Sequence, residues 1–289
     1  MKKTPILFVC AAMMLTGCSG ATATIKDKDE TIMTIGDTKY TKGDEYELLK
    51  VSTGTDLTME LVKQAIYKQE VKVTKEMKEK AQEQVNNYKE NMENFNEQIQ
   101  SLGYKNSKQY MNKVLIPSLQ ASELTEKYFT DAKKDVQKTY KPSKARIIQC
   151  ENKATAKKAL KALKSGTDPE EVAQQYMVDS AKYSGKETLV TTKTTDVSTR
   201  LINKLAKAKK AGVIDEVFTN ESSGNTYAYV AVLVSNTYKD IKDEVYTSLS
   251  SDDDITKACL VYYLKKYNFE VHDQDVFNNL KANNPEYLE

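Results

Sequence analysis

The sequence predicts an α+β fold in which a small α/β module interrupts a mostly helical chain. From Thr58 to about Lys138, apolar residues recur at intervals of three and four, the period of helices with one buried face. The pattern changes at Tyr140-Lys141-Pro142-Ser143, because helices usually stop before a proline, and Ala145–Cys150 has the composition of a strand. A helical pattern returns after about residue 255.

The first 17 residues have the pattern of an export signal. Two lysines precede the apolar run Ile6–Leu15, which is too short to cross a bilayer, because a spanning helix needs about 20 apolar residues. The run ends in Leu15-Thr16-Gly17-Cys18, which resembles the lipobox of bacterial lipoproteins, whose cysteine is acylated and becomes the first residue. An ordinary signal peptide with a chance cysteine is the alternative. The motif favours a signal peptide over residues 1–17 and a lipid on Cys18.

The charge balance argues against nucleic acid as a partner. The sequence has 43 Lys and Arg and 41 Asp and Glu, and removal of the signal would take away two lysines and no acid. The mature chain would then be formally neutral, without the basic patch that nucleic acid requires. We therefore expect the lipid to be the anchor and the outer face of the cell membrane to be the location.

The cysteines and the histidine exclude a metal site. Cys10 leaves with the signal and Cys18 carries the lipid, so Cys150 and Cys259 remain. They could form one disulfide, but they fall in different predicted domains, which favours two separate buried thiols. One histidine, His272, and two distant cysteines cannot assemble a metal site, and no cofactor is expected.

The N-terminal part of the mature chain divides into a tether and a helical domain. Residues 18–30 are small and polar, without periodicity, and predict a flexible tether. The domain, residues 31–140, is expected to open with a hairpin that turns at Gly36-Asp37. Helices follow, among them a long polar one with Thr74 as its N-cap, apolar residues from Met77 to Phe95 and Gly103 at the end of the stretch.

Residues 141–237 predict the order strand, helix, helix, helix, strand, strand. The expected strands are Ala145–Cys150, Val213–Phe218 and Tyr227–Val234. The expected helices are Ala154–Lys164, one that begins with Asp168 as N-cap and Pro169 in the first turn, and Val197–Ala208.

Residues 238–289 predict a polar linker around Ser250–Asp254, a helix over Ile255–Tyr267 and a last helix near Val276–Leu280. A segment of this size cannot bury a core by itself. We therefore expect it to pack against another part of the chain.

The order of these segments resembles that of the PrsA-type extracellular foldases, lipoproteins that help secreted proteins to fold. The motifs that carry the resemblance are Ile32–Asp37 with Thr41–Asp44, Leu102-Gly103-Tyr104 followed by Tyr110, and Leu264–Val271. The resemblance covers nearly the whole chain. It implies that the C-terminal segment packs back on the N-terminal helices as one SurA-like chaperone domain, with a parvulin-like domain inserted between its two parts.

The inserted module resembles a parvulin, the fold of a class of prolyl isomerases. Active parvulins open with Ala-Ser-His-Ile-Leu, where this chain has Lys144–Ile148, and close with Gly-Tyr-His, where it has Thr226-Tyr227-Ala228. Ser184-Gly185-Lys186 replaces the family's Gly-Gly-Asp. The resemblance implies a degenerate site at five positions, in which both family histidines and the family's methionine and phenylalanine are replaced. These positions are Arg146, Asp179, Val197, Leu201 and Ala228.

The replacements predict weak or lost isomerase activity. Rotation about a prolyl bond has a barrier of ~18–20 kcal/mol, which a parvulin lowers with a hydrophobic cup and a histidine-centred hydrogen-bond network. Neither Arg146 nor Ala228 can replace a neutral imidazole. We expect Arg146 to form an ion pair with Asp179, because a buried guanidinium needs an acid beside it, and the alternative is an arginine that extends into solvent.

Three functions are compatible with these observations. The leading one is a membrane-anchored chaperone whose partners are unfolded or partly folded secreted proteins. The second is a working peptidyl-prolyl isomerase of the parvulin type with a substituted site. The third, a solute-binding lipoprotein, is disfavoured because no repeated strand-helix unit appears. A homodimer is left open.

Overall fold

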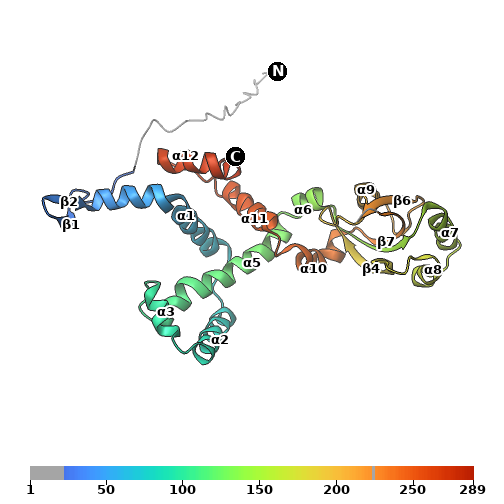
Figure 1. Ribbon diagram of the computed structural model, residues 1–289, viewed down its shortest axis with the longest axis horizontal. Helices are drawn as coiled ribbons and strands as arrows, with labels where there is room; N and C mark the ends of the chain where they lie inside the picture. Colours follow the sequence, from blue (N-terminus) through green and yellow to red (C-terminus); the bar gives the residue numbers. More distant parts are fainter. Residues whose placement is uncertain (1–22, 223–224) are drawn as a thin grey trace, which may run out of the picture. The chain divides into compact units, whose positions relative to one another are not determined.

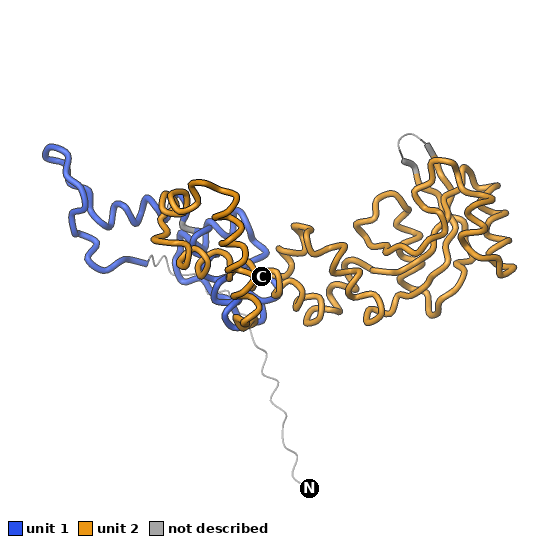
Figure 2. The backbone as a smooth tube through the Cα atoms, turned by 90° about the horizontal axis from the view of Figure 1, so that it is seen from below, with its two compact units in different colours: residues 1–69, 260–289 blue, residues 70–259 orange. Residues whose placement is uncertain are grey.

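The computed structural model describes residues 23–222 and 225–289. The described residues form two compact units, one of residues 23–69 and 260–289 and the other of residues 70–222 and 225–259 (Figure 2). Helices predominate, and the strands form one two-stranded and one five-stranded sheet (Figure 1). The predicted α+β class is confirmed. The lipobox, Cys18 and the signal peptide lie outside the described residues.

The first unit opens with the hairpin that the sequence predicts. Strands β1 (Thr31–Ile35) and β2 (Thr38–Thr41) are antiparallel, and Ile35 pairs with Thr38 across a two-residue turn. Gly36 has φ of 58°, a conformation that glycine adopts without a steric penalty. This hairpin leads directly into helix α1 (Lys42–Glu70).

Helix α1 begins with a reciprocal cap. The Thr41 backbone N–H donates to Asp44 Oδ2 at 2.7 Å, and the Asp44 N–H donates to Thr41 Oγ1 at 3.2 Å. Both bonds satisfy backbone donors that the first helical turn leaves without partners. The end of the predicted tether joins this start, because Gly43 N donates to Lys28 O at 2.7 Å and Lys42 N to Glu30 O at 2.8 Å. The backbone of residues 28 and 30 is therefore hydrogen-bonded to the start of α1. A flexible tether over residues 18–30 would have left these two residues free.

The C-terminal residues of the first unit include helix α12 (Gln274–Asn283) and a 3₁₀ turn (Pro285–Leu288). Helix α11 (Asp253–Lys266) precedes them and spans the boundary between the units. Asp273 caps α12 by accepting hydrogen bonds from the Asp275 and Val276 N–H groups at 2.9 and 3.1 Å.

The second unit begins with helices. They are α2 (Lys75–Asn91), α3 (Phe95–Ser101), α4 (Ser107–Tyr110), a π-helical turn (Met111–Leu115), α5 (Ile116–Asp131) and α6 (Lys133–Tyr140). Thr74 caps α2 as predicted, since its side chain accepts from Met77 N at 3.1 Å. The helix is interrupted at residues 92–94, where the sequence predicted that it would continue. Ala81, Val85, Phe95, Ile99, Leu115 and Ile116 form the buried core of this part.

The sheet follows in the same unit. Its strands are β3 (Ser143–Cys150), β4 (Ser184–Val190), β5 (Gly212–Val213), β6 (Phe218–Ser222) and β7 (Asn225–Ser235), in the order β4-β3-β7-β5, with β6 also paired to β7. Strand β4 was not predicted. The single strand expected over Val213–Phe218 is two strands separated by an irregular segment.

Two layers of helices cover the sheet. Helices α7 (Lys153–Lys164) and α8 (Pro169–Tyr176) pack on one face, with Ile148, Cys150 and Val230, and α9 (Thr199–Lys207) packs on the other, with Ile147, Tyr229 and Leu233 (Figure 1). Asp168 caps α8 as predicted, since it accepts from Glu170 N at 2.8 Å. The alternation of side chains along β3 and β7 therefore decides on which face of the sheet each side chain lies.

Residues 238–249 form helix α10 (Tyr238–Leu249), which belongs to the second unit. The Tyr238 hydroxyl donates to Phe129 O at 2.7 Å, and Lys144 Nζ lies 2.8 Å from Glu244 Oε1. Helix α10 thus connects the sheet to the helices that precede it. This explains why these parts form one compact unit.

Cys150 and Cys259 are buried free thiols. In residues 23–222 and 225–289, no helix is long and apolar enough to cross a membrane. The same residues contain no cluster of three or more His, Cys, Asp or Glu side chains that could hold a metal ion.

Candidate functional site

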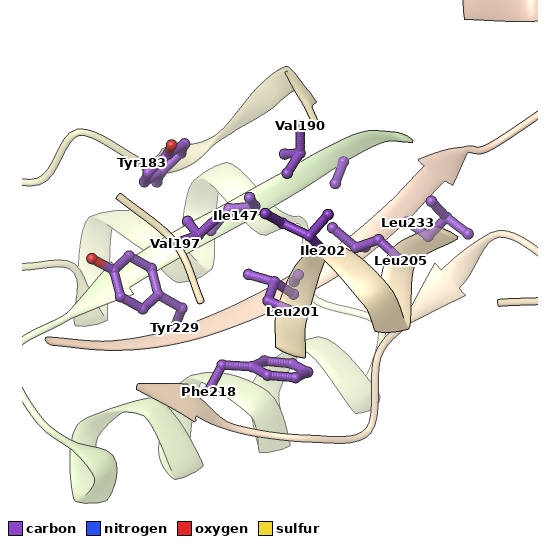
Figure 3. Packing of buried hydrophobic residues seen from close by; sticks show 12 residues of the cluster. Ile147, Tyr183, Val190, Val197, Leu201, Ile202, Leu205, Phe218, Tyr229 and Leu233 are labelled. Carbon is purple, nitrogen blue, oxygen red and sulfur yellow. The ribbon is translucent and has the colours of Figure 1, made fainter. Parts of the chain in front are cut away.

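The α9 face of the sheet carries the side chains that the parvulin resemblance would place in a substrate cup. Val197 precedes α9, Leu201 lies in its first turn, and both pack against Ile147 of β3 and Tyr229 of β7 (Figure 3). Val197 is 3% exposed, Tyr229 is 1% exposed, and Ile147 and Leu201 are fully buried. The face is a packed core.

Arg146 and Ala228 lie on the other face. Ala228 packs with Ile148, Cys150 and Val230 in the cluster under α7 and α8. Arg146 follows the same alternation along β3, so its side chain points away from Val197 and Leu201. By the same alternation Ile147 and Tyr229, each one residue along from Arg146 and Ala228, lie on the α9 face. The structure does not bring the five predicted positions together.

The predicted ion pair between Arg146 and Asp179 is wrong. The Arg146 guanidinium lies 3.1 Å from Glu187 Oε1 on the neighbouring strand β4 and 3.3 Å from Glu170 Oε1 at the start of α8. Arg146 and Glu187 are direct cross-strand partners, which explains the pairing. Asp179 lies in the exposed turn between α8 and β4. The arginine is partnered as expected, but by different acids.

Strand β4 reaches α8 through Gly185. Its φ is 80°, and a Cβ atom at this position would lie 2.3 Å from the Pro169 carbonyl oxygen. A residue with a side chain therefore cannot occupy this position without moving α8. The register between β3 and β4 shifts at this point, which places a bulge before the regular pairs Glu187–Val190.

A polar network closes one end of the α9 face. The Tyr183 hydroxyl donates to Asp196 Oδ1 at 2.6 Å, and Lys182 forms an ion pair with the same carboxylate. The Tyr183 and Tyr229 rings meet edge to face with centroids 6.2 Å apart. Figure 3 shows both tyrosines at the same end of the cluster, opposite Leu205 and Leu233. Two phenols and a carboxylate therefore lie together at this end of the α9 face.

The site shifts the pKa values of its tyrosines and of its carboxylate in opposite directions. Burial, followed by the hydrogen bond to Asp196, raises the pKa of Tyr183 above its usual range. Burial also raises the pKa of Tyr229 to about 12. Burial alone would raise the pKa of Asp196, but the hydrogen bonds from Lys182 and Tyr183 outweigh it and lower the value. At neutral pH the site holds two neutral phenols and one carboxylate.

A groove runs along β4 beside this network. It has a volume of about 440 Å³ and is bounded on one side by Lys186, Glu187, Thr188 and Leu189 and on the other by the loop of residues 193–196. The loop is internally bonded: Thr191 N donates to Thr194 Oγ1 at 3.0 Å, and Lys193 N donates to Thr191 Oγ1 at 3.1 Å. The groove therefore has two ordered walls.

Solved structures with a similar fold were found. Peptidyl-prolyl isomerase PrsA from Bacillus cereus is 22% identical, with a TM-score of 0.50 over 88% of this chain and 98% of that chain. The chain has the PrsA fold. Foldase protein PrsA from Streptococcus pneumoniae is 20% identical, with a TM-score of 0.41 over 89% of this chain and 100% of that one. PrsA from Bacillus subtilis is also 20% identical, with a TM-score of 0.37 over 88% and 99% of the two chains.

No protein-family model and no curated protein matches the sequence. The resemblance to PrsA that the sequence suggested is supported by the Bacillus cereus structure, at the level of the fold. Tyr183, Asp196 and Tyr229 were not among the site residues predicted from the sequence. Strict alternation of Tyr227, Tyr229 and Ala231 along a buried strand was the signal that could have identified Tyr229.

Proposed function

We propose that this chain is a membrane-anchored, extracytoplasmic foldase that holds unfolded secreted proteins and has lost prolyl isomerase activity. The observation that carries the proposal is the packed α9 face. Val197 and Leu201, which the resemblance assigns to the proline cup, are buried in one cluster with Ile147 and Tyr229.

The loss of activity follows from access and from chemistry. A proline ring could contact Val197 or Leu201 only after the core opened, since these side chains are 3% and 0% exposed. The single histidine of the sequence, His272, belongs to the first unit, where it lies 3.8 Å from Glu270. A phenol whose pKa burial raises, such as Tyr229, stays neutral at physiological pH, but its side chain is no more accessible than the others.

The holding activity is supported by apolar side chains exposed on the first unit. The hairpin β1–β2 exposes Ile35 by 71%, and α1 exposes Leu57 by 55% and Leu61, one helical turn later, by 69%. Further members of this set are Ile32, Met33, Tyr40, Leu48 and Leu49. Leu57 and Leu61 lie one turn apart on α1, and exposed apolar patches mark sites of interaction to which unfolded chains present apolar segments.

The membrane anchor is supported by the Leu15-Thr16-Gly17-Cys18 motif. One lipid chain gives only marginal membrane affinity, and stable anchoring takes two chains or one chain with a basic patch. Because the mature chain is formally neutral, the proposal requires more than one acyl chain at Cys18. Replacement of Cys18 by alanine should release the protein from the membrane. Fatty-acid labelling of the wild type checks this, and unlabelled wild-type protein would exclude the anchor.

The proposed activity is tested on one mature, unlipidated protein with two assays. Aggregation of a denatured client should be suppressed, while a protease-coupled assay of prolyl isomerisation should give the uncatalysed rate. Replacement of Leu57 and Leu61 by serine should weaken suppression, whereas Lys68→Ser on the same helix should leave it unchanged. Isomerase activity without suppression would reverse the proposal and favour the enzyme.

A further inference from the structure

Strand β4 has an open edge. It lies at the end of the five-stranded sheet and pairs with β3, and within the described residues no other strand adjoins it. The backbone hydrogen bonds made outside helices and strands include none by residues 184–190 in the described part of the chain. An edge strand alternately directs its N–H and C=O groups outward, so β4 presents a row of unused donors and acceptors.

The groove beside β4 runs along this edge. Consecutive side chains of a strand point to opposite faces of a sheet, so a hollow over one face would be lined by every second residue. Lys186, Glu187, Thr188 and Leu189 are consecutive, and all four line the groove. Residues 187–189 of the regular part of the strand therefore lie against the hollow.

The opposite wall is held in place from several directions. Asp196 is bound by Tyr183, and the Thr195 carbonyl accepts from Asn220 Nδ2 at 3.3 Å. Lys193 lies 3.1 Å from Asp252 Oδ2 in the turn before α11 and also pairs with Asp254 in the first turn of α11. A groove with a fixed wall loses little conformational entropy when a segment enters it.

Among the charged side chains that line the groove, Lys186 is the one without an oppositely charged partner in the described part of the chain. Glu187 is satisfied by Lys144 and Arg146, Lys193 by Asp252 and Asp254, and Lys182 by Asp196. Lys186 is exposed and forms no ion pair within the described residues. A second copy of β4 would bring another Lys186 to the same edge, so charge disfavours self-association and favours a segment with a carboxylate.

We propose that the open edge of β4 receives an extended segment of an unfolded client chain, bearing an acidic side chain, as an added strand. The inference rests on the proposed holding function and assigns it a second contact, in the sheet module. Main-chain hydrogen bonds would supply binding that tolerates many sequences, as in strand addition generally. Lys186 would supply the preference for acidic segments.

Hydrogen exchange on the full mature chain tests the proposal. The probe is reduced, carboxymethylated α-lactalbumin, which stays unfolded and is acidic. Amides of residues 184–190 should exchange more slowly when the probe is bound. Bound probe without protection at β4 would overturn this inference and leave the holding function intact. Failure of the probe to bind at all would overturn both.

Two sets of variants sharpen the test. Lys186→Glu should weaken binding of the probe about fivefold, the size of one exposed charge pair, while Lys157→Glu on the exposed side of α7 should have no effect. Neighbouring N–H groups alternate between β3 and the open edge, so of Thr188→Pro and Leu189→Pro, one should keep its melting temperature and lose binding. If the stable proline variant and Lys186→Glu both bind normally, the added strand is excluded.

Discussion

Lys50 Nζ lies 2.8 Å from Asp275 Oδ2, although only 5% of the lysine side chain is exposed. Glu47 and Asp273 lie 3.3 and 3.8 Å from the same nitrogen. The ion pair with Asp275 raises the pKa of Lys50, and burial opposes this rise without cancelling it. Within the first unit, one buried cation therefore joins α1 to the start of α12.

Replacement of Lys50 by methionine should loosen α12. The change keeps the apolar stem but leaves Asp273, which is 11% exposed, beside an uncharged group. We expect the free energy that holds α12 in place to fall by about 2 kcal/mol, because removal of the lysine leaves a carboxylate without its partner in a partly buried site. Faster hydrogen exchange in α12 measures the effect. Lys42→Met, whose partner Glu30 is exposed, should change stability by less than about 0.5 kcal/mol.

The same cluster predicts a loss of stability in acid. Burial raises the pKa of Asp273, but hydrogen bonds from Ala23 N and Val276 N and the charge of Lys50 lower it overall. A carboxyl with a lowered pKa in the folded state contributes stability above its unfolded pKa of about 3.9, and loses it as the pH falls through the folded value. The protection factors of the α12 amides, which correct for the intrinsic pH dependence of exchange, should therefore fall below about pH 4. Asp273→Asn should remove that dependence, and an unchanged pH profile would contradict the assignment.

Gly185→Ala should destabilise the second unit strongly. The substitution combines a φ of 80° with a Cβ placed 2.3 Å from the Pro169 carbonyl oxygen, so both strain and overlap oppose it. We expect the free energy of unfolding, measured with urea, to fall by about 3 kcal/mol. Gly166 has φ of 92° with open space around its Cβ position, so Gly166→Ala should cost about 1 kcal/mol from strain alone. Equal losses would show that β4 does not approach α8 this closely.

Tyr183→Phe should weaken the wall of the β4 groove. The substitution removes the hydroxyl that donates to Asp196, so that Lys182 is the remaining side-chain partner of this carboxylate. We expect the free energy of unfolding to fall by about 1.5 kcal/mol. Because the pKa of Asp196 is lowered, this contribution is present above about pH 4 and disappears in acid. Urea unfolding at two pH values checks both statements. Tyr176→Phe, in the same unit, should be nearly neutral.

The two cysteines should be inert in the folded protein. Burial raises the pKa of Cys150 to about 11 and that of Cys259 to about 12, so almost no thiolate exists at neutral pH. Iodoacetamide should label neither residue in native buffer and both in denaturant. Rapid native labelling would show that one of these sites opens frequently.

Local chemistry made several elements predictable. Thr74 and Asp168 cap helices because each side chain reaches an N–H only two or three residues away, and Gly36-Asp37 turns a hairpin because glycine accepts positive φ. The break after Asn91 was missed, since the apolar pattern continues to Phe95 across it.

The sequence by itself determined the helical caps, the hairpin, the α+β class and the absence of histidine from the sheet module. Tertiary structure alone decided the existence of β4, whose residues Ser184–Val190 are mostly polar and become a strand by pairing with β3. It also decided that Ile147 and not Arg146 faces α9, and that Arg146 binds Glu170 and Glu187. The physical reason is that strand register and ion-pair partners depend on residues distant in sequence, and a shift of one residue exchanges the two faces of a sheet.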